Sequence, residues 1–337
     1  MPESALGWAL RPAARPVAGG GHIARCTALA RALSGYTPVT MILEGGADAR
    51  QLRLAADIQV IAERDACRST FAGIVLDDYK FVAEDVARWR ARTCGPVVQI
   101  EDLGRPLAGI DFAVNATPGL SGDRLNGVPA FLGPSYAILA KPYESPPKPE
   151  IRTKVERVVI GIGLYDTTNT TQFAMEAVAK ALPDASTDVL LGKSSPNATE
   201  VAAMARRHPR MRVHSDATEP WRIVQDADIT ISGGGQSLLE RLATGIPTIG
   251  IAVADNQRLA LSGAAASGAA VDLGAVSSLD AGLIMDAIAE LAHDAERRRA
   301  LSLAAQRLVD GRGAARVASH LLSLRRAGWR HGARLRR

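Results

Sequence analysis

Residues 231–257 read ISGGGQSLLERLATGIPTIGIAVADNQ and predict a strand, a glycine-rich turn, a helix and a second strand. The first strand is expected over Ile229–Ser232, and apolar residues at helical spacing run over Leu238–Thr244. Gly245 stands where helices often end in a left-handed residue, and the proline at 247 blocks further helix. The second strand is expected over Pro247–Val253. This order is typical of a parallel sheet covered by helices.

The same alternation runs through the rest of the chain. Helical spacing over His22–Leu33 places four apolar residues on one face. Short apolar runs, which we expect to be strands, lie at Thr40–Leu43, Ile58–Ile61, Gly73–Leu76, Val97–Ile100, Phe112–Asn115, Arg157–Ile162, Asp188–Leu191 and Met211–His214. Such alternation predicts mainly parallel sheets with helices on both faces.

A proline-rich segment divides the chain. Residues 141–150 read KPYESPPKPE, with four prolines and mixed charge, so we expect an extended linker. The predicted fold class is α/β of the GT-B type, in which two Rossmann-like domains face each other across a ligand-binding cleft. We place the first domain at residues 1–143, the second at 153–325 and a basic tail at 326–337. The second boundary is open, because helices after Leu279 could pack back on the first domain.

The charge distribution bears on partners. The chain has 337 residues and a formal net charge of +5, and residues 325–337, RRAGWRHGARLRR, contain no acid. Without this segment the body is close to neutral, which argues against nucleic acid as a partner. The tail is interpreted either as a contact for anionic surfaces such as lipid or RNA, or as a solvated end.

The cysteines and the N-terminal sequence indicate the cellular compartment to expect. Cys26, Cys67 and Cys94 form neither a disulfide framework nor a structural zinc pattern. The N-terminal stretch MPESALGWALRPAARP is broken by prolines, unlike a signal peptide, and no run approaches the ~18 apolar residues of a membrane helix. We therefore expect a soluble, cytoplasmic protein with reduced thiols and no integral membrane segment.

The first motif with chemical meaning is AGGGHIARC, residues 18–26. Glycines such as Gly21 let the backbone turn tightly and expose N–H groups, and the next helix adds its positive end. His22 stands at this end, where a cationic imidazole is disfavoured, so it could accept a proton as a general base. The alternative is that His22 only caps the turn.

The second motif is the glycine-rich turn quoted first. Gly233, Gly234 and Gly235 precede a helix, an arrangement that suits a diphosphate. Ser237 and Glu240 have the spacing of a capping box, which would give Glu240 a structural role. Alternatively, the Glu240 carboxylate accepts hydrogen bonds from ribose hydroxyls.

Two further polar segments lie at the ends of predicted strands. Residues 161–171, GIGLYDTTNTT, contain Gly163 and four threonines that could line a phosphate or sugar site, or form an ordinary turn. Residues 254–257, ADNQ, follow a strand whose carboxyl end should face the ligand crevice. Asn256 and Gln257 could bind sugar amides or hydroxyls, or belong to a simple Asx-type turn.

The segment LDDYK, residues 76–80, also follows a predicted strand. Tyr79 could form a hydrogen bond to a substrate, and Asp77 could orient His22 or a water molecule. An ordinary polar loop explains these residues equally well.

Asp226 and Asp228 form an Asp-x-Asp pair of the kind used in metal-dependent sugar transfer. Here the pair lies between a helix and a strand, where solvated flanking charges are expected. We therefore predict no metal ligand and no cofactor.

A rival pattern points to NAD. Gly19, Gly21 and Ala24, with Glu44 about twenty residues further on, mimic a dinucleotide fingerprint. An NAD-dependent oxidoreductase is thus an alternative, although it leaves the second glycine cluster and His22 without a role.

Five stretches in one order, GGGHIARCTALARAL, LDDY, FLGPSYAIL, SGGGQSLLERLATGIP and ADNQ, carry a family resemblance over residues 8–258. The chain resembles the UDP-2,4-diacetamido-2,4,6-trideoxy-β-L-altropyranose hydrolases of the pseudaminic acid pathway. That resemblance implies a GT-B fold and an enzyme that supplies sugar for flagellin or surface glycans. Spore-coat polysaccharide glycosyltransferases and lipid-linked muramyl glycosyltransferases share parts of the pattern.

The resemblance also implies roles for single residues. His22 would be the catalytic base, with Tyr79 and Asn256 at further active-site positions. Arg11 matches an arginine near the N-terminus of the family and would position the sugar. The nucleotide-binding segment is matched by Gly234, Gly235, Ser237 and Glu240.

Three departures from the family pattern surround the sugar and the phosphates. The family has an aspartate shortly after the arginine matched by Arg11, whereas this chain reads RPAA with Ala13. The family usually has His where this chain has Asp78, and a loop resembling GGSDP where residues 161–168 read GIGLYDTT.

Taken with the motifs, the resemblance implies an inverting, metal-independent hydrolase of a UDP-linked diacetamido-trideoxyhexose. His22 would take a proton from water as the water attacks the anomeric carbon. Backbone N–H groups over Gly233–Ser237 would hold the departing UDP. The alternatives are a glycosyltransferase that uses an acceptor hydroxyl and a non-catalytic binder of the same nucleotide-sugar.

Overall fold

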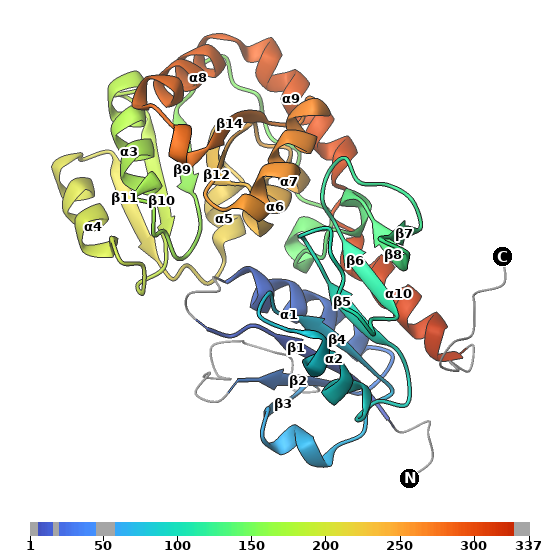
Figure 1. The fold of residues 1–337 in the computed structure, drawn as a ribbon. Helices are drawn as coiled ribbons and strands as arrows, with labels where there is room; N and C mark the ends of the chain where they lie inside the picture. Colours follow the sequence, from blue (N-terminus) through green and yellow to red (C-terminus); the bar gives the residue numbers. More distant parts are fainter. Residues whose placement is uncertain (1–5, 16–19, 45–57, 327–337) are drawn as a thin grey trace.

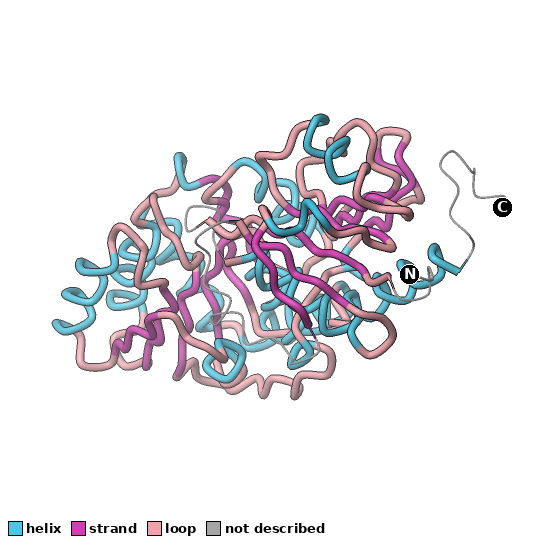
Figure 2. Tube along the Cα trace, turned by 90° about the horizontal axis from the view of Figure 1, so that it is seen from below, coloured by secondary structure: helices cyan, strands magenta, loops and turns pink. Residues whose placement is uncertain are grey.

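The computed structural model describes residues 6–15, 20–44 and 58–326. Two α/β halves, each built on its own sheet, lie side by side (Figure 1). Figure 2 shows the strands of both sheets with helices packed beside them. The predicted fold class, with two mainly parallel sheets, is confirmed.

The N-terminal sheet has eight strands within the described ranges, in the order β3-β2-β1-β4-β5-β6-β8-β7. Neighbouring strands in it are parallel except β7 and β8. The helical elements of this half are α1 (Gly21–Ser34), η4 (Asp65–Arg68), α2 (Ala83–Arg90), η5 (Pro134–Tyr136) and η6 (Lys141–Tyr143). The strands are β1 (Trp8–Pro12), β2 (Val39–Leu43), β3 (Ile58–Ala62), β4 (Gly73–Asp77), β5 (Val97–Ile100), β6 (Phe112–Asn115), β7 (Arg124–Leu125) and β8 (Val128–Leu132).

The C-terminal sheet has six parallel strands among the described residues, in the order β11-β10-β9-β12-β13-β14. Its strands are β9 (Arg157–Gly161), β10 (Ser186–Leu191), β11 (Met211–Ser215), β12 (Ile229–Gly233), β13 (Thr248–Ala252) and β14 (Val271–Ala275). The helices are α3 (Thr170–Ala181), α4 (Ala198–Arg207), α5 (Pro220–Val224), α6 (Gln236–Thr244), α7 (Asp255–Ala266), η7 (Val276–Ser278), α8 (Ala281–His293), α9 (Ala295–Leu308) and α10 (Gly313–Arg326).

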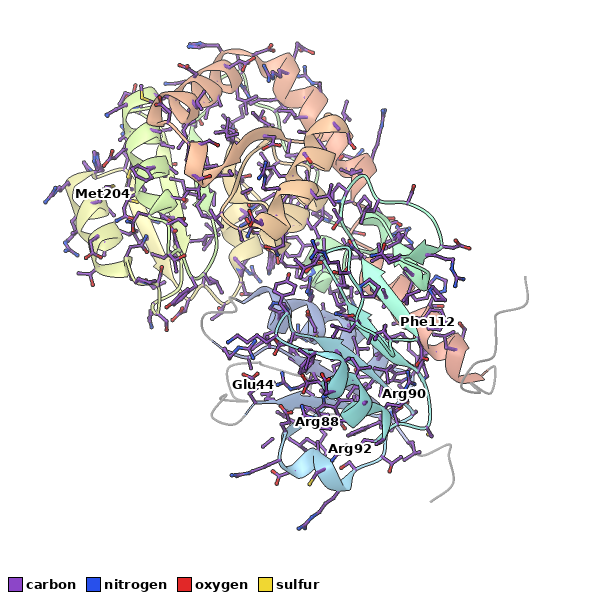
Figure 3. All side chains as sticks on the ribbon, in the orientation of Figure 1. Glu44, Arg88, Arg90, Arg92, Phe112 and Met204 are labelled. Atoms are coloured by element: carbon purple, nitrogen blue, oxygen red, sulfur yellow. The ribbon has the colours of Figure 1, made fainter. Side chains whose placement is uncertain are left out.

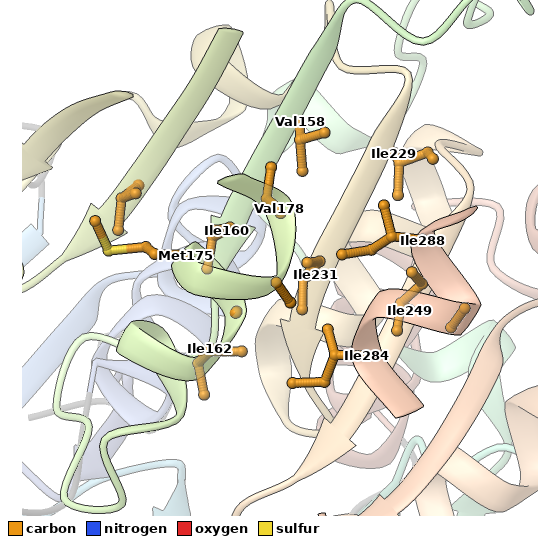
Figure 4. Close-up of a cluster of buried hydrophobic side chains, with 14 of the residues drawn as sticks. Val158, Ile160, Ile162, Met175, Val178, Ile229, Ile231, Ile249, Ile284 and Ile288 are labelled. Carbon is orange, nitrogen blue, oxygen red and sulfur yellow. The ribbon is translucent and has the colours of Figure 1, made fainter. Parts of the chain in front are cut away.

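The core of the C-terminal half explains the apolar runs of its strands. Ile160 of β9, Ile231 of β12 and Ile249 of β13 are fully buried against α3 and α8 (Figure 4). Met175 and Ile284 are the corresponding buried side chains of the two helices. Because each strand is covered on both faces, its sequence reads as a continuous apolar run.

Helix α10 crosses from the C-terminal half to the N-terminal sheet (Figure 1). Val317 and Leu321 of α10 are fully buried in one cluster with Leu10 and Leu33. His320 stacks on Phe131 of β8 with ring centroids 4.5 Å apart. The end of the chain therefore completes the core of the first half. Within the described ranges, no helix has both the length and the apolar composition that crossing a membrane requires.

Candidate active site

The first turns of helices α1 and α6, one in each half, face each other. Helix α1 begins at Gly21 and helix α6 at Gln236, and the two helices are in contact. A Cβ atom placed on Gly21 would lie 3.3 Å from the Cβ of Gln236, so the two helix starts approach each other closely. The positive ends of two helices therefore converge where the halves meet.

His22 and Asp77 form a buried pair at this edge. His22 lies in the first turn of α1, and Asp77 is the last residue of β4. The His22 Nδ1 atom lies 2.6 Å from Asp77 Oδ1. A carboxylate at Nδ1 fixes the tautomer and leaves Nε2 as the proton-accepting nitrogen. Of the two roles open to Asp77, orienting His22 is the one that the geometry fits.

Arg25 holds Asp77 from the other side. Its Nε and Nη2 atoms donate to Oδ2 and Oδ1 of Asp77 at 2.7 and 2.6 Å. Burial alone would raise the pKa of Asp77, but the charge and hydrogen bonds of Arg25, with the contact from His22, lower that pKa to about 2. Asp77 is therefore ionised at neutral pH although its side chain is fully buried.

Tyr79 connects the two halves. Its hydroxyl donates to Asp102 Oδ2 at 2.5 Å, and Asn256 Nδ2 of helix α7 donates to the hydroxyl oxygen at 3.2 Å. The Tyr79 ring also stands edge-on to the His22 ring, with centroids 4.6 Å apart. Burial, followed by the charge of Asp102, raises the pKa of Tyr79 well above its ordinary value, so the phenol stays protonated.

Arg25 and Asp102 are part of this cluster but were not singled out from the sequence. Arg25 Nη1 donates to Asp102 Oδ2 at 2.7 Å, so the arginine bridges two carboxylates. A signal for Arg25 did exist, because it stands three residues after His22 and therefore on the same helix face. Asp102 had no comparable signal, since only the sheet order places the end of β5 beside that of β4.

Gln257 holds the turn that follows β12. Its Oε1 atom accepts the N–H groups of Gly234 and Val253 at 3.0 and 3.1 Å. A Cβ on Gly233 would lie 2.2 Å from the Ile162 carbonyl oxygen, which explains the glycine there. Gln257, which could bind sugar by the sequence analysis, thus binds the backbone through its Oε1 atom. Gly235 is the residue immediately before α6.

The capping box expected for Ser237 and Glu240 is wrong. Helix α6 begins at Gln236, so Ser237 lies inside the first turn, where its Oγ accepts from Ser232 Oγ at 3.2 Å. Glu240 accepts a hydrogen bond from Tyr143 at 3.2 Å. Burial raises the pKa of Glu240. The carboxylate therefore packs against the segment that joins the two halves.

Arg11 belongs to an ion cluster at the ends of the N-terminal strands. Its Nη2 atom lies 3.0 Å from Glu44 and 2.7 Å from Glu63. Figure 3 labels Glu44, which directly follows β2 in the N-terminal half. Arg15 donates to Glu44 and, at 2.9 and 2.5 Å, to both oxygens of Asp78. Asp78 thus has two arginine partners, since Arg11 Nη1 also lies 3.7 Å away.

The loop over residues 161–171 is organised by Asp166. This buried carboxylate accepts the N–H groups of Thr168 and Thr171 at 2.9 and 2.8 Å, and these bonds lower its pKa against the effect of burial. A Cβ on Gly163 would meet no atom within 4 Å, so Gly163 lies at an open position of the loop.

The structure also shows the surroundings of the Asp-x-Asp pair and of the described part of the NAD fingerprint. Asp226 is exposed, but Asp228 is buried and accepts from Arg152 at 2.9 Å, so the expectation of two solvated charges is wrong for Asp228. Within the described ranges no group of three or more potential ligands is arranged to hold a metal. In the NAD fingerprint, Gly19 lies outside the described residues, and Glu44 is occupied by arginines.

Comparison with known proteins gives a distant sequence relative and clear structural neighbours. No family model matches the chain. The protein named spore coat polysaccharide biosynthesis protein SpsG, from Bacillus subtilis (strain 168), is 22% identical over 250 residues, which cover 72% of this chain and 74% of that protein.

Several solved structures superpose over almost the whole chain. MurG of Acinetobacter baumannii matches with a TM-score of 0.64 at 13% identity, over 94% of this chain and 99% of its own. The spinosyn rhamnosyltransferase SpnG, complexed with thymidine diphosphate, has a TM-score of 0.63 at 16% identity, covering 95% and 100%. S. aureus MnaA, in a co-structure with UDP, has a TM-score of 0.65 at 14% identity, covering 95% and 97%. The chain therefore has the GT-B fold.

Proposed function

We propose that this protein is a nucleotide-sugar hydrolase that releases UDP from a UDP-linked 2,4-diacetamido-2,4,6-trideoxyhexose. The observation that carries the proposal is the His22–Asp77 pair, 2.6 Å apart, beside the Tyr79–Asn256 contact at the edge where the two halves meet. A base held by an ionised carboxylate at this edge suits activation of an oxygen nucleophile. The likeness to nucleotide-sugar proteins and the sequence resemblance supply the choice of substrate.

In the proposed reaction, His22 Nε2 removes a proton from water as the water oxygen bonds to the anomeric carbon. The bond between this carbon and the UDP oxygen breaks, and its electron pair leaves with UDP. Attack from the side opposite the leaving group inverts the anomeric configuration. Asp77 stays ionised and stabilises the imidazolium that forms, and this positioned proton transfer contributes on the order of 10²- to 10⁴-fold in rate.

The leaving UDP needs donors that compensate its growing charge. The first N–H groups of helix α6 lack partners within the helix, and the positive end of that helix points to the same place. The Gly234 N–H is not among these donors while it binds Gln257, so Gln257 serves to hold the turn. One donor of this kind is commonly worth about 10²- to 10³-fold in turnover.

Transfer to an acceptor hydroxyl is the second candidate function. Leu103 and Leu259 are each about half exposed, at 50% and 51%, and they follow Asp102 and Asn256 along the chain. Exposed apolar side chains this close in sequence to Asp102 and Asn256 favour an acceptor with an apolar part. The name of SpnG, a rhamnosyltransferase, points the same way, and SpsG is named for polysaccharide biosynthesis.

The test is the release of UDP from the UDP-diacetamido-sugar, followed by ³¹P NMR with the purified chain. Hydrolysis predicts release in buffer alone. Release that occurs only after an alcohol acceptor is added would replace hydrolysis by transfer. Binding without release under both conditions would make the protein a non-catalytic binder.

A further inference from the structure

We propose that Arg25 and Asp102 are positioning residues that link the Tyr79–Asn256 contact between the two halves to the His22–Asp77 pair. The inference deepens the proposed function and rests on it for the identity of His22 as the base. It assigns roles to two residues that do not themselves bond to a substrate: Arg25 orients the carboxylate behind the base, and Asp102 orients Tyr79.

The first argument is the fork geometry of Arg25. Its Nε and Nη2 atoms bind the two oxygens of Asp77, and its Nη1 atom binds Asp102, so one rigid guanidinium spans both carboxylates. The side chain is 9% exposed. Because all three nitrogens of the planar Arg25 guanidinium form hydrogen bonds, they fix the plane of the Asp77 carboxylate. That carboxylate in turn fixes the orientation of the His22 ring. Lysine offers a single nitrogen and cannot reproduce this arrangement.

The second argument concerns the proton of Tyr79. The hydroxyl donates its proton to Asp102, so only oxygen lone pairs remain for other partners. Asn256 Nδ2 uses one of them at 3.2 Å. Tyr79 therefore faces the opposite half as an acceptor, and a substrate that displaces Asn256 must present a donor, such as an amide N–H or a hydroxyl group. Because Asp102 accepts the Tyr79 proton, it makes the Tyr79 oxygen an acceptor toward the opposite half.

The third argument is that these contacts form one continuous chain. From Asn256 the hydrogen bonds pass through Tyr79, Asp102, Arg25 and Asp77 to His22. The outermost members belong to different halves, and Asn256 is 177 residues from Tyr79 in sequence. A substrate that displaces Asn256 changes the hydrogen-bond partner of Tyr79. Asp102 and Arg25 then transmit this change to His22.

The experiment uses the full-length protein labelled with ¹⁵N-histidine and four variants. In the wild type, NMR detects the Nδ1–H proton of His22 bound to Asp77, and its assignment comes from its loss in His22→Asn. Arg25→Lys and Asp102→Asn are the test variants. Glu84→Gln, on the exposed surface of α2, is the control.

We expect the Nδ1–H resonance to shift or exchange with solvent in Arg25→Lys, to shift less in Asp102→Asn, and to stay unchanged in Glu84→Gln. UDP affinity, measured by calorimetry, should stay within about threefold of the wild type in both test variants, while turnover falls at least tenfold with KM little changed. Removing the negative charge of Asp102 should also move the acidic limb of the turnover profile to lower pH, since the remaining Arg25 charge disfavours a second cation.

An unchanged His22 resonance in both test variants would overturn the proposal. A loss of UDP binding in parallel with turnover would do so as well, because it would indicate a merely structural salt bridge. If Arg25→Lys does not fold, Asp102→Asn decides alone, since Asp102 is the more exposed partner. The His22 resonance is measured without substrate, so it tests the positioning roles independently of turnover. A wild-type protein that releases no UDP would refute the proposed function but not these roles.

Discussion

The Nδ1 atom of His22 lies 2.6 Å from Oδ1 of Asp77, although 55 residues separate the two in sequence. The first turn of α1 carries the imidazole, and the carboxyl end of β4 carries the carboxylate. Both ends point to the edge where the two halves meet, because β1 and β4 are parallel neighbours and α1 follows β1. The pair is therefore a consequence of topology.

Replacing His22 by Asn should remove most turnover and keep nucleotide binding. Asparagine can fill the space but cannot accept the proton of water, so we expect turnover to fall by about 10²- to 10⁴-fold. Single-turnover rates and UDP affinity should be measured on the same preparation. Full turnover in this variant would show that another group serves as the base.

Asp77 should make stability dependent on pH in the acidic range. Its pKa falls from an ordinary value of 3.8 to about 2 in the folded protein, so the ionised form stabilises the fold. A carboxylate whose pKa is lower in the folded than in the unfolded protein stabilises the fold fully at pH values above its unfolded-state pKa. This stabilisation is lost as the pH falls through its folded-state pKa. We expect a loss on the order of 2 kcal/mol between about pH 4 and pH 2.

The measurement is the free energy of unfolding against pH for the wild type and Asp77→Asn. The variant should lack this acid-dependent component, whereas the exposed Asp123→Asn should retain it. Identical pH profiles for wild type and Asp77→Asn would refute the assignment.

Tyr79 and Asn256 should show energetic coupling in turnover. Their hydrogen bond of 3.2 Å joins the two halves, and residues in direct contact usually give non-additive effects. A double-mutant cycle with Tyr79→Phe and Asn256→Ala should give a coupling of about 0.5–1.5 kcal/mol in kcat/KM. Strict additivity would mean that this contact is not formed during the reaction.

Gln257→Ala should weaken UDP binding. The substitution leaves the Gly234 and Val253 N–H groups without their acceptor, so the turn before α6 loses its fixed shape. We expect about a tenfold loss of UDP affinity, equivalent to about 1.4 kcal/mol, by calorimetry. Ser262→Ala, on the exposed side of α7, is the control, because Ser262 lies away from the Gly234 and Val253 N–H groups that Gln257 binds. Unchanged affinity would separate Gln257 from nucleotide binding.

Helix α10 should stabilise the N-terminal half. Leu321 is fully buried in the cluster that includes Leu10 and Leu33, so Leu321→Ala should cost about 2–5 kcal/mol in urea unfolding. The exposed Ser319→Ala on the same helix is the control and should change stability little. An equally small effect of both substitutions would show that α10 is dispensable for that core.

Much of the fold could be predicted from the sequence, because buried parallel strands leave continuous apolar runs. The strands predicted around Gly73 and Ile229 were found with bounds within one or two residues. Strand β1, over Trp8–Pro12, is not among the predicted strands, because its short apolar run ends in a proline and lies in a proline-interrupted segment. Strand β14 was missed too, because two of its five residues are Asp272 and Gly274.

The site was less predictable, because its geometry depends on which strand ends become neighbours. The sequence could name His22, Asp77, Tyr79 and Asn256 as polar residues at strand and helix ends. It could not show that Arg25 bridges Asp77 and Asp102, since that contact requires β4 and β5 to be adjacent. The capping-box prediction failed for a local reason, since α6 begins one residue before Ser237.

The most direct test is hydrolysis of the UDP-diacetamido-trideoxyhexose in ¹⁸O-water, followed by NMR and mass spectrometry of both products. The account predicts that the label enters the sugar, that UDP leaves unlabelled, and that the new sugar first appears with inverted anomeric configuration. Label in UDP, a retained anomer, or binding of the UDP-sugar without any release of UDP would contradict it.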